Sequence, residues 1–123
     1  MREILFRGKR ADNGEWVEGN LFIPDYPDKP TEICIGTNVV RITYEVYPET
    51  VGMYTGKKDK NNKKIFTKDI VKAWLHNETP MIFPITFRAG CFWYGNWNFC
   101  EFLDKFRNIE VIGNVFDNPE LLK

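Results

Sequence analysis

The 123-residue sequence predicts a mainly β protein, built as a barrel or a sandwich and not as a parallel α/β fold. Three observations carry this prediction. Short runs rich in Val, Ile and aromatic residues recur at close spacing, and Gly, Asn or Pro signals separate them. Helix is expected only at residues 98–106 and in the tail after Asn118, and both segments are short. With 43% hydrophobic and 15% aromatic residues, the chain has enough apolar material for a core.

The first segment is predicted to be a β-hairpin. Residues 4–7 are short and apolar, residues 12–14 read Asp-Asn-Gly, and an extended run follows at 16–23. Asn-Gly tolerates the positive φ angles of a tight hairpin turn. In the return strand, alternate residues fall on one face, namely Val17, Gly19, Leu21 and Ile23.

Three prolines interrupt the chain next and predict an irregular loop over residues 24–31. Extended structure is expected to resume at 33–35, with a turn at 36–38 and a strand at 39–47. In that last strand four apolar residues alternate with polar ones: Val40, Ile42, Tyr44 and Val46. The Pro-Glu-Thr sequence at 48–50 is the predicted joint between an N-terminal β subdomain (residues 1–50) and a second subdomain (51–123).

The second subdomain is predicted to consist of further short strands. They are expected at residues 51–55, 65–75, 81–88, 91–94 and 110–116. The polar tract 56–64 forms a hairpin loop between the first two of these. Asp69 is expected to hydrogen-bond the backbone in a tight turn at the start of a strand.

Three parts of the sequence follow a known pattern. The first is REILFRGKR at 2–10 with GEWVEG at 14–19, the second is PETVGMYTG at 48–56 running on to residue 71, and the third is VIGNVFDNPELL at 111–122. In this order and spacing they resemble the YopX family of phage- and prophage-encoded proteins. The chain departs from the family at Asn62 and Lys68, where Gly is common.

The resemblance implies a mainly β protein whose C-terminal half is an SH3-like barrel. It also implies an origin in a phage or an integrated prophage. It implies no catalytic residues, because none is established for the family. The fold class predicted overall is therefore all-β, an N-terminal β subdomain followed by an SH3-like barrel.

Composition restricts the class of protein. The formal net charge is zero, from 17 Lys and Arg against 17 Asp and Glu, so the chain as a whole lacks the basic excess of a dedicated nucleic-acid binder. No apolar run approaches the ~20 residues that span a bilayer, and the charged N-terminal residues are not those of a signal peptide. An odd number of cysteines, three, suits a reducing compartment. We expect a cytoplasmic protein with no membrane partner.

No catalytic, metal or cofactor site is expected. The chain contains no serine and one histidine, His76, and nothing in the local sequence pairs that residue with Cys91 or Cys100. The spacing of the cysteines does not match that of structural zinc ligands. We therefore expect a non-enzyme.

Two groups of residues are candidates for binding. The first is a lysine-rich hairpin, whose members are Lys57, Lys58, Lys60, Lys63 and Lys64. It would contact phosphates without reading bases, or it would only keep an exposed loop solvated. The second is an aromatic group that would anchor a protein interface or pack a core, with Trp93, Tyr94 and Trp97 as the predicted interface residues.

The function predicted from these features is a non-catalytic protein-interaction module. The partner would be a host or phage protein, and self-association into a homo-oligomer is also expected, since strand edges and surplus aromatic residues need covering. The alternative is nonspecific nucleic-acid binding through the lysine hairpin.

Overall fold

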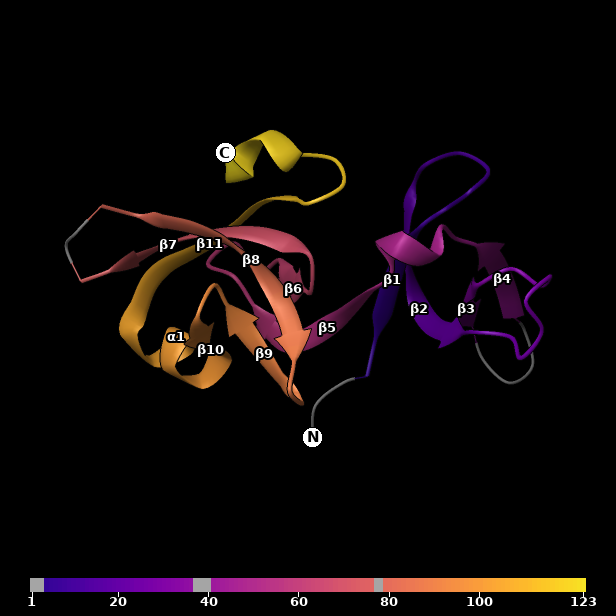
Figure 1. The fold of residues 1–123 in the computed structure, drawn as a ribbon, viewed down its shortest axis with the longest axis horizontal. Helices are drawn as coiled ribbons and strands as arrows, with labels where there is room; N and C mark the ends of the chain where they lie inside the picture. Colours follow the sequence, from indigo (N-terminus) through magenta and orange to yellow (C-terminus); the bar gives the residue numbers. More distant parts are fainter. Residues whose placement is uncertain (1–3, 37–40, 77–78) are drawn as a thin grey trace. The chain divides into compact units, whose positions relative to one another are not determined.

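The structure is a computed structural model that describes residues 4–36, 41–76 and 79–123 (Figure 1). Within these residues the chain is mainly β, as predicted. The strands are β1 (Phe6–Lys9), β2 (Trp16–Phe22), β3 (Glu32–Gly36), β4 (Arg41–Glu45), β5 (Gly52–Lys58), β6 (Lys64–Phe66), β7 (Asp69–Leu75), β8 (Met81–Arg88), β9 (Cys91–Tyr94), β10 (Trp97–Asn98) and β11 (Phe106–Asn114). The helices are α1 (Phe99–Lys105) and the short 3-10 helices η1 (Pro48–Thr50) and η2 (Pro119–Leu122).

The chain divides into two compact units, residues 1–54 and 55–123. The division falls within β5, whereas the sequence led us to expect a joint after residue 50. Residues 37–40, on which the predicted turn and the first part of the predicted strand 39–47 fall, lie outside the described part of the chain.

In the first unit, β1 to β4 form an antiparallel meander, and the start of β5 adds to the other edge of β1. The predicted hairpin at 4–23 is confirmed. Its turn is held by the Gly14 N–H, which donates to the Arg10 carbonyl at 3.0 Å, and Gly14 has φ 75°. Positive φ at this position explains why Gly stands there.

The sheet of the first unit curls until the end of β4 returns to the end of β1. The Ala11 N–H donates to the Glu45 carbonyl at 3.0 Å, and the Tyr47 N–H donates to the Lys9 carbonyl at 2.9 Å. Enclosed by this curl is a small core of Val17, Ile33 and Val46. The predicted alternation is correct at Val17 and Val46, which are buried while their neighbours are more exposed. It is wrong at Ile23 and Ile42, which are 67% and 52% exposed.

The second unit is an antiparallel sheet in the order β10-β9-β8-β7-β11, together with the β5–β6 hairpin. The sequence predicted a single strand at 65–75, but a tight turn divides it into β6 and β7. At this turn Lys68 adopts φ 74°, and the buried Asp69 carboxylate accepts a hydrogen bond from the Phe66 N–H at 2.7 Å. Asp69 therefore has the turn role that was predicted for it.

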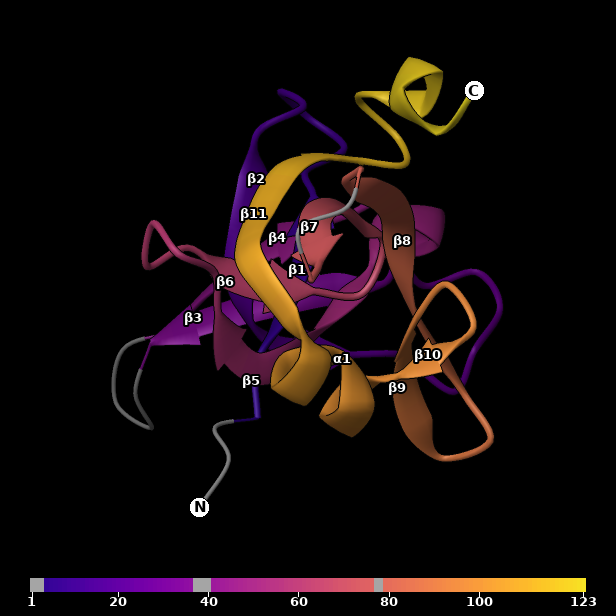
Figure 2. The same ribbon diagram turned by 90° about the vertical axis from the view of Figure 1, so that its left-hand side faces the viewer.

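The sheet of the second unit is not a closed barrel, so this part of the SH3-like prediction is wrong. Closure would require the edge strands β10 and β11 to pair, and instead α1 connects them (Figure 2). Helix α1 begins at Asn98, whose side chain accepts a hydrogen bond from the Glu101 N–H at 3.0 Å. It buries Phe99 and Phe102. The second unit therefore has a helix where a closed barrel would have paired edge strands.

Candidate binding surfaces

The lysine hairpin connects β5 to β6 and is organised by one carboxylate. Asp59 is 8% exposed, and three backbone N–H groups donate to its side chain, each at 2.9 Å. Two of these belong to the hairpin tip, at Asn61 and Lys63, and the third belongs to Val111 of β11. The Lys60 N–H also donates to the Ile109 carbonyl at 2.9 Å. The tip is thus attached to β11 and is not a loosely held loop.

The ammonium-bearing side chains of the hairpin project from this fixed backbone. Lys57, Lys58, Lys60 and Lys63 are exposed, and Lys64 is half-buried. Lys60 lies 3.8 Å from Glu110, and both side chains of this ion pair are more than one third exposed. Such an exposed pair contributes little to stability. All five predicted lysines lie on one hairpin, formed by β5, β6 and the turn between them.

The aromatic group is mainly a core. Tyr94 and Phe102 are fully buried, with ring centroids 4.2 Å apart, and Phe106 lies 5.3 Å from Tyr94. The Tyr94 hydroxyl lies 2.8 Å from the Met81 carbonyl oxygen and 3.0 Å from that of Val71, and it shares its proton between them. Burial raises the pKa of Tyr94. This residue holds β7 and β8 together and is not accessible to a partner, which corrects its predicted place in a protein interface.

The other two predicted interface residues are half-buried. Trp93 donates its indole N–H to the Arg88 carbonyl at 3.0 Å, and the Arg88 guanidinium lies 4.1 Å from the centre of its ring. Trp97 packs edge-on against Phe106, with centroids 5.4 Å apart. Of the consecutive residues Phe92, Trp93 and Tyr94, the outer two are buried and Trp93 is half-buried, because successive side chains of a strand point to opposite faces. Within the predicted aromatic group most rings contact each other and are not available to a partner.

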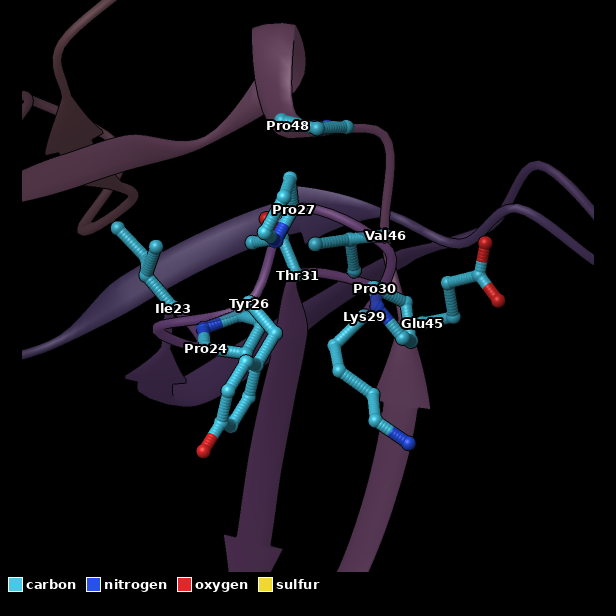
Figure 3. A pocket seen from close by; sticks show the side chains of 10 residues that line it. All are labelled: Ile23, Pro24, Tyr26, Pro27, Lys29, Pro30, Thr31, Glu45, Val46 and Pro48. Atoms are coloured by element: carbon cyan, nitrogen blue, oxygen red, sulfur yellow. The ribbon is translucent and has the colours of Figure 1, made fainter.

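A different apolar surface lies in the first unit, in the loop of residues 24–31, for which the prolines predicted only a break between strands. A hollow of about 380 Å³ opens between this loop and the end of β4 (Figure 3). Its apolar lining consists of Ile23, Pro24, Pro27, Pro30, Val46 and Pro48, with the Tyr26 ring beside them. We call this feature the proline groove. In the sequence, the only hint of this groove is the regular spacing of the three prolines in the loop.

The proline groove is exposed along one side and charged at the other. Ile23 and Tyr26 are each 67% exposed. Figure 3 shows these two side chains on one side of the groove, with Lys29 and Glu45 on the opposite side. The Val46 N–H donates to the Thr31 carbonyl at 3.0 Å, so the loop is fastened to the strand that forms the floor of the groove.

The two units carry opposite net charge, although the whole chain is neutral. Residues 1–54 contain 6 Lys and Arg against 9 Asp and Glu, a net −3, whereas residues 55–123 contain 11 against 8, a net +3. The proline groove lies in the acidic unit, and acidic residues adjoin its lining in sequence at Asp25, Asp28 and Glu49. The lysine hairpin lies in the basic unit.

The cysteines and acidic side chains form no metal site in the described part of the chain. Cys91 and Cys100 are exposed and Cys34 is half-buried; none of them is in a disulfide. No group of three or more His, Cys, Asp and Glu side chains in the described ranges could hold a metal ion. Within the same ranges, no helix has the length and apolarity needed to cross a membrane.

Sequence comparison places the chain in a family. The model of the YopX protein family matches residues 5–123, nearly the whole chain. The chain belongs to the YopX family. The resemblance seen in the sequence is thereby confirmed, and it extends through the second unit, including residues 76–100. No match was found among curated proteins.

A solved structure supports the fold of this YopX family member. The crystal structure of protein EF1440 from Enterococcus faecalis is similar over 100% of both chains, with a TM-score of 0.61 and 22% sequence identity. At this identity the likeness concerns the fold and carries no information about function. The family and the all-β fold are therefore established, and the function has to be argued from the surfaces.

Proposed function

We propose that this chain is a phage- or prophage-encoded accessory protein of the host cytoplasm that acts by binding another protein, without catalysis, through the proline groove. The observation that carries the proposal is the exposure of Ile23 and Tyr26 beside a hollow lined by prolines and Val46. Clustered apolar side chains on a surface cost free energy in water unless a partner covers them. The family membership supports the phage origin.

The chemistry of the groove indicates the kind of segment that would bind. An apolar floor takes Pro, Leu or Val side chains of an extended segment, because a proline-rich segment loses little conformational entropy on binding. The groove wall itself holds one cation, Lys29, and one carboxylate, Glu45, so the net charge of −3 on the unit decides the sign of the field around it. A partner segment with apolar residues flanked by Lys or Arg would satisfy both features.

The proposal is tested by NMR titration with a synthetic ten-residue peptide of alternating Leu and Pro flanked by arginines. We expect amide shifts confined to residues 23–31 and 45–48, and weaker shifts with a peptide whose arginines are replaced by glutamates. Tyr26→Ala should reduce the affinity about tenfold, because an exposed aromatic anchor is lost. Ile42→Ala is the matched control, since Ile42 is 52% exposed but does not line the groove.

Three results would contradict the proposal. Equal shifts with the arginine and glutamate peptides would remove the charge argument. Shifts spread over residues 55–123 would place the binding elsewhere. Shifts at the groove that depend on protein concentration, without peptide, would show that a second copy of the chain occupies it.

A further inference from the structure

We propose that the lysine hairpin and the neighbouring outer surface of β7 and β11 form a second binding site, for the phosphodiester backbone of nucleic acid. This site is independent of the proline groove. It is built entirely from residues 57–110 of the second unit, and the basic charge of that unit is hidden in the neutral total for the chain.

The hairpin lysines are continued by two cations on the adjacent sheet. Strand register places Glu110 opposite Lys72 and Arg107 opposite Trp74, so these four side chains lie on one face of the β7–β11 pair. Because Lys60 of the hairpin lies 3.8 Å from Glu110, the hairpin and this face meet at that carboxylate. Together the hairpin and this face carry seven cations: Lys57, Lys58, Lys60, Lys63, Lys64, Lys72 and Arg107. Consecutive residues of β5 point to opposite faces of the strand, so only some of these cations face one ligand at a time.

The backbone under these cations is fixed before any ligand arrives. Asp59 joins the hairpin tip to β11 through three N–H donors, and Arg107 donates to the Asp104 and Phe106 carbonyls at 2.8 and 2.9 Å. A phosphate-binding surface that is already ordered loses less conformational entropy on binding than a flexible lysine tail would. The rigid attachment therefore favours a binding role over simple solvation of a loop.

The lysines of the site have the chemistry to contact phosphates without reading bases, and Arg107 already donates through one guanidinium nitrogen to two backbone carbonyls. Lysine ammonium groups act as point charges on phosphate oxygens and carry no sequence information. The nearest aromatic side chain, Trp74, already has the Lys72 ammonium 5.2 Å from its ring centre, so it is not an open platform for base stacking. We expect binding to duplex DNA and RNA without sequence preference, and at least as tight as binding to single strands, since a duplex presents its phosphates at higher density.

The salt dependence of binding gives a quantitative expectation. A surface of seven cations that engages about four phosphates at once should give a slope of log K against log salt near −4, because each neutralised phosphate contributes about −0.9. Replacing two of the engaged lysines by glutamate should reduce the magnitude of that slope by about 2. The Kd itself should rise more than tenfold at low salt.

The test is fluorescence anisotropy of labelled 20-nucleotide duplex DNA, single-stranded DNA and duplex RNA, each titrated with the full chain at three salt concentrations. The variant is Lys57→Glu/Lys63→Glu, and the matched control is Lys105→Glu/Lys123→Glu. Both double variants change the net charge by the same amount, and all four lysines are exposed, so both proteins should fold. Circular dichroism checks that they do.

Salt-sensitive binding of all three probes that is lost in the hairpin variant and kept in the control would support the site. Absence of binding at low salt would overturn the proposal, and so would equal losses in both variants or an unchanged slope in the hairpin variant. Preference for one single-stranded sequence would also overturn it, because contacts to phosphates alone do not discriminate between bases. None of these outcomes bears on the proline groove, which the peptide titration tests separately.

Discussion

The two units of this chain solve the same problem, burying one face of an antiparallel sheet, in different ways. The first unit curls until β4 returns to β1 and encloses three aliphatic side chains. The second unit stays open and buries Tyr94, Phe102 and Phe106 with the help of α1. The first core is thus covered by curvature of its own sheet, whereas the second is covered in part by a helix.

The units also differ in backbone strain. Among the described residues, every non-glycine residue with positive φ belongs to the second unit: Asn62, Lys68, His76, Ala89 and Asn108. In the first unit the described positive-φ position is Gly14. Several turns of the second unit therefore carry steric strain at non-glycine residues, and the packing of its larger core offsets that strain.

The comparison of the cores predicts the largest effects. Phe102→Ala should lower the free energy of unfolding by about 3–5 kcal/mol, because Phe102 is fully buried against Tyr94, Phe99 and Phe106. Phe87→Ala, at a ring that is 49% exposed, is the control and should cost much less. Urea unfolding measures both. Equal losses would mean that the aromatic rings are not the core of the second unit.

Asp59→Ala should have the next largest effect, about 2–3 kcal/mol, since three backbone N–H groups lose their acceptor. Hydrogen exchange should accelerate at Asn61, Lys63 and Val111, and nowhere in residues 4–36. Asp59→Asn keeps one side-chain oxygen as an acceptor and should cost less. Uniform acceleration across both units would contradict the role of this carboxylate as a local fastening of the hairpin.

Tyr94→Phe should cost about 1–2 kcal/mol near pH 8, because the hydroxyl bonds to two strand carbonyls are lost. Burial raises the pKa of Tyr94, so the folded chain keeps this phenol protonated. The unfolded phenol titrates near pH 10, and its contribution to stability is therefore complete below that pH and declines above it. The difference between the wild type and Tyr94→Phe should shrink between pH 8 and pH 11 in chemical unfolding. A difference that grows would refute the assignment.

The smallest effect is expected from relief of backbone strain. Lys68→Gly should raise the free energy of unfolding by about 0.5 kcal/mol, since Gly takes φ 74° without a steric penalty but gains freedom in the unfolded chain. Asn62→Gly should change stability less, because Asn tolerates this conformation. Thermal unfolding of the two variants compares them. A loss of stability in Lys68→Gly would show that its side-chain contact with the Phe116 ring, at 5.4 Å, outweighs the strain.

Much of the fold was predictable because its signals are local. The Asp-Asn-Gly turn, the alternation along β2 and β4, and the Asn98 start of α1 each follow from neighbouring residues. The family resemblance was likewise carried by short stretches. The lysine hairpin could be located for the same reason, because its lysines lie close together in the sequence.

Other features could not be predicted because they depend on which distant residues meet. Barrel closure depends on whether β10 and β11 pair, and in the structure they remain the two edges of the sheet with α1 connecting them. The sequence around Tyr94 does not show that it is buried. Its hydroxyl is satisfied by carbonyl groups of β7 and β8, which are distant in the chain, so the sequence suggested an interface residue instead. The proline groove needs Val46 and Pro48 beside a loop about twenty residues earlier.

The sequence by itself determined the family, the all-β class, the local turns and the basic hairpin. The tertiary structure alone decided which aromatic side chains are core, where the apolar surface lies, and which cations extend the hairpin. The physical reason is that strand alternation specifies which side chains share a face of one strand, whereas burial depends on what covers that face. That covering is supplied by segments far away in the chain, and no local pattern records it.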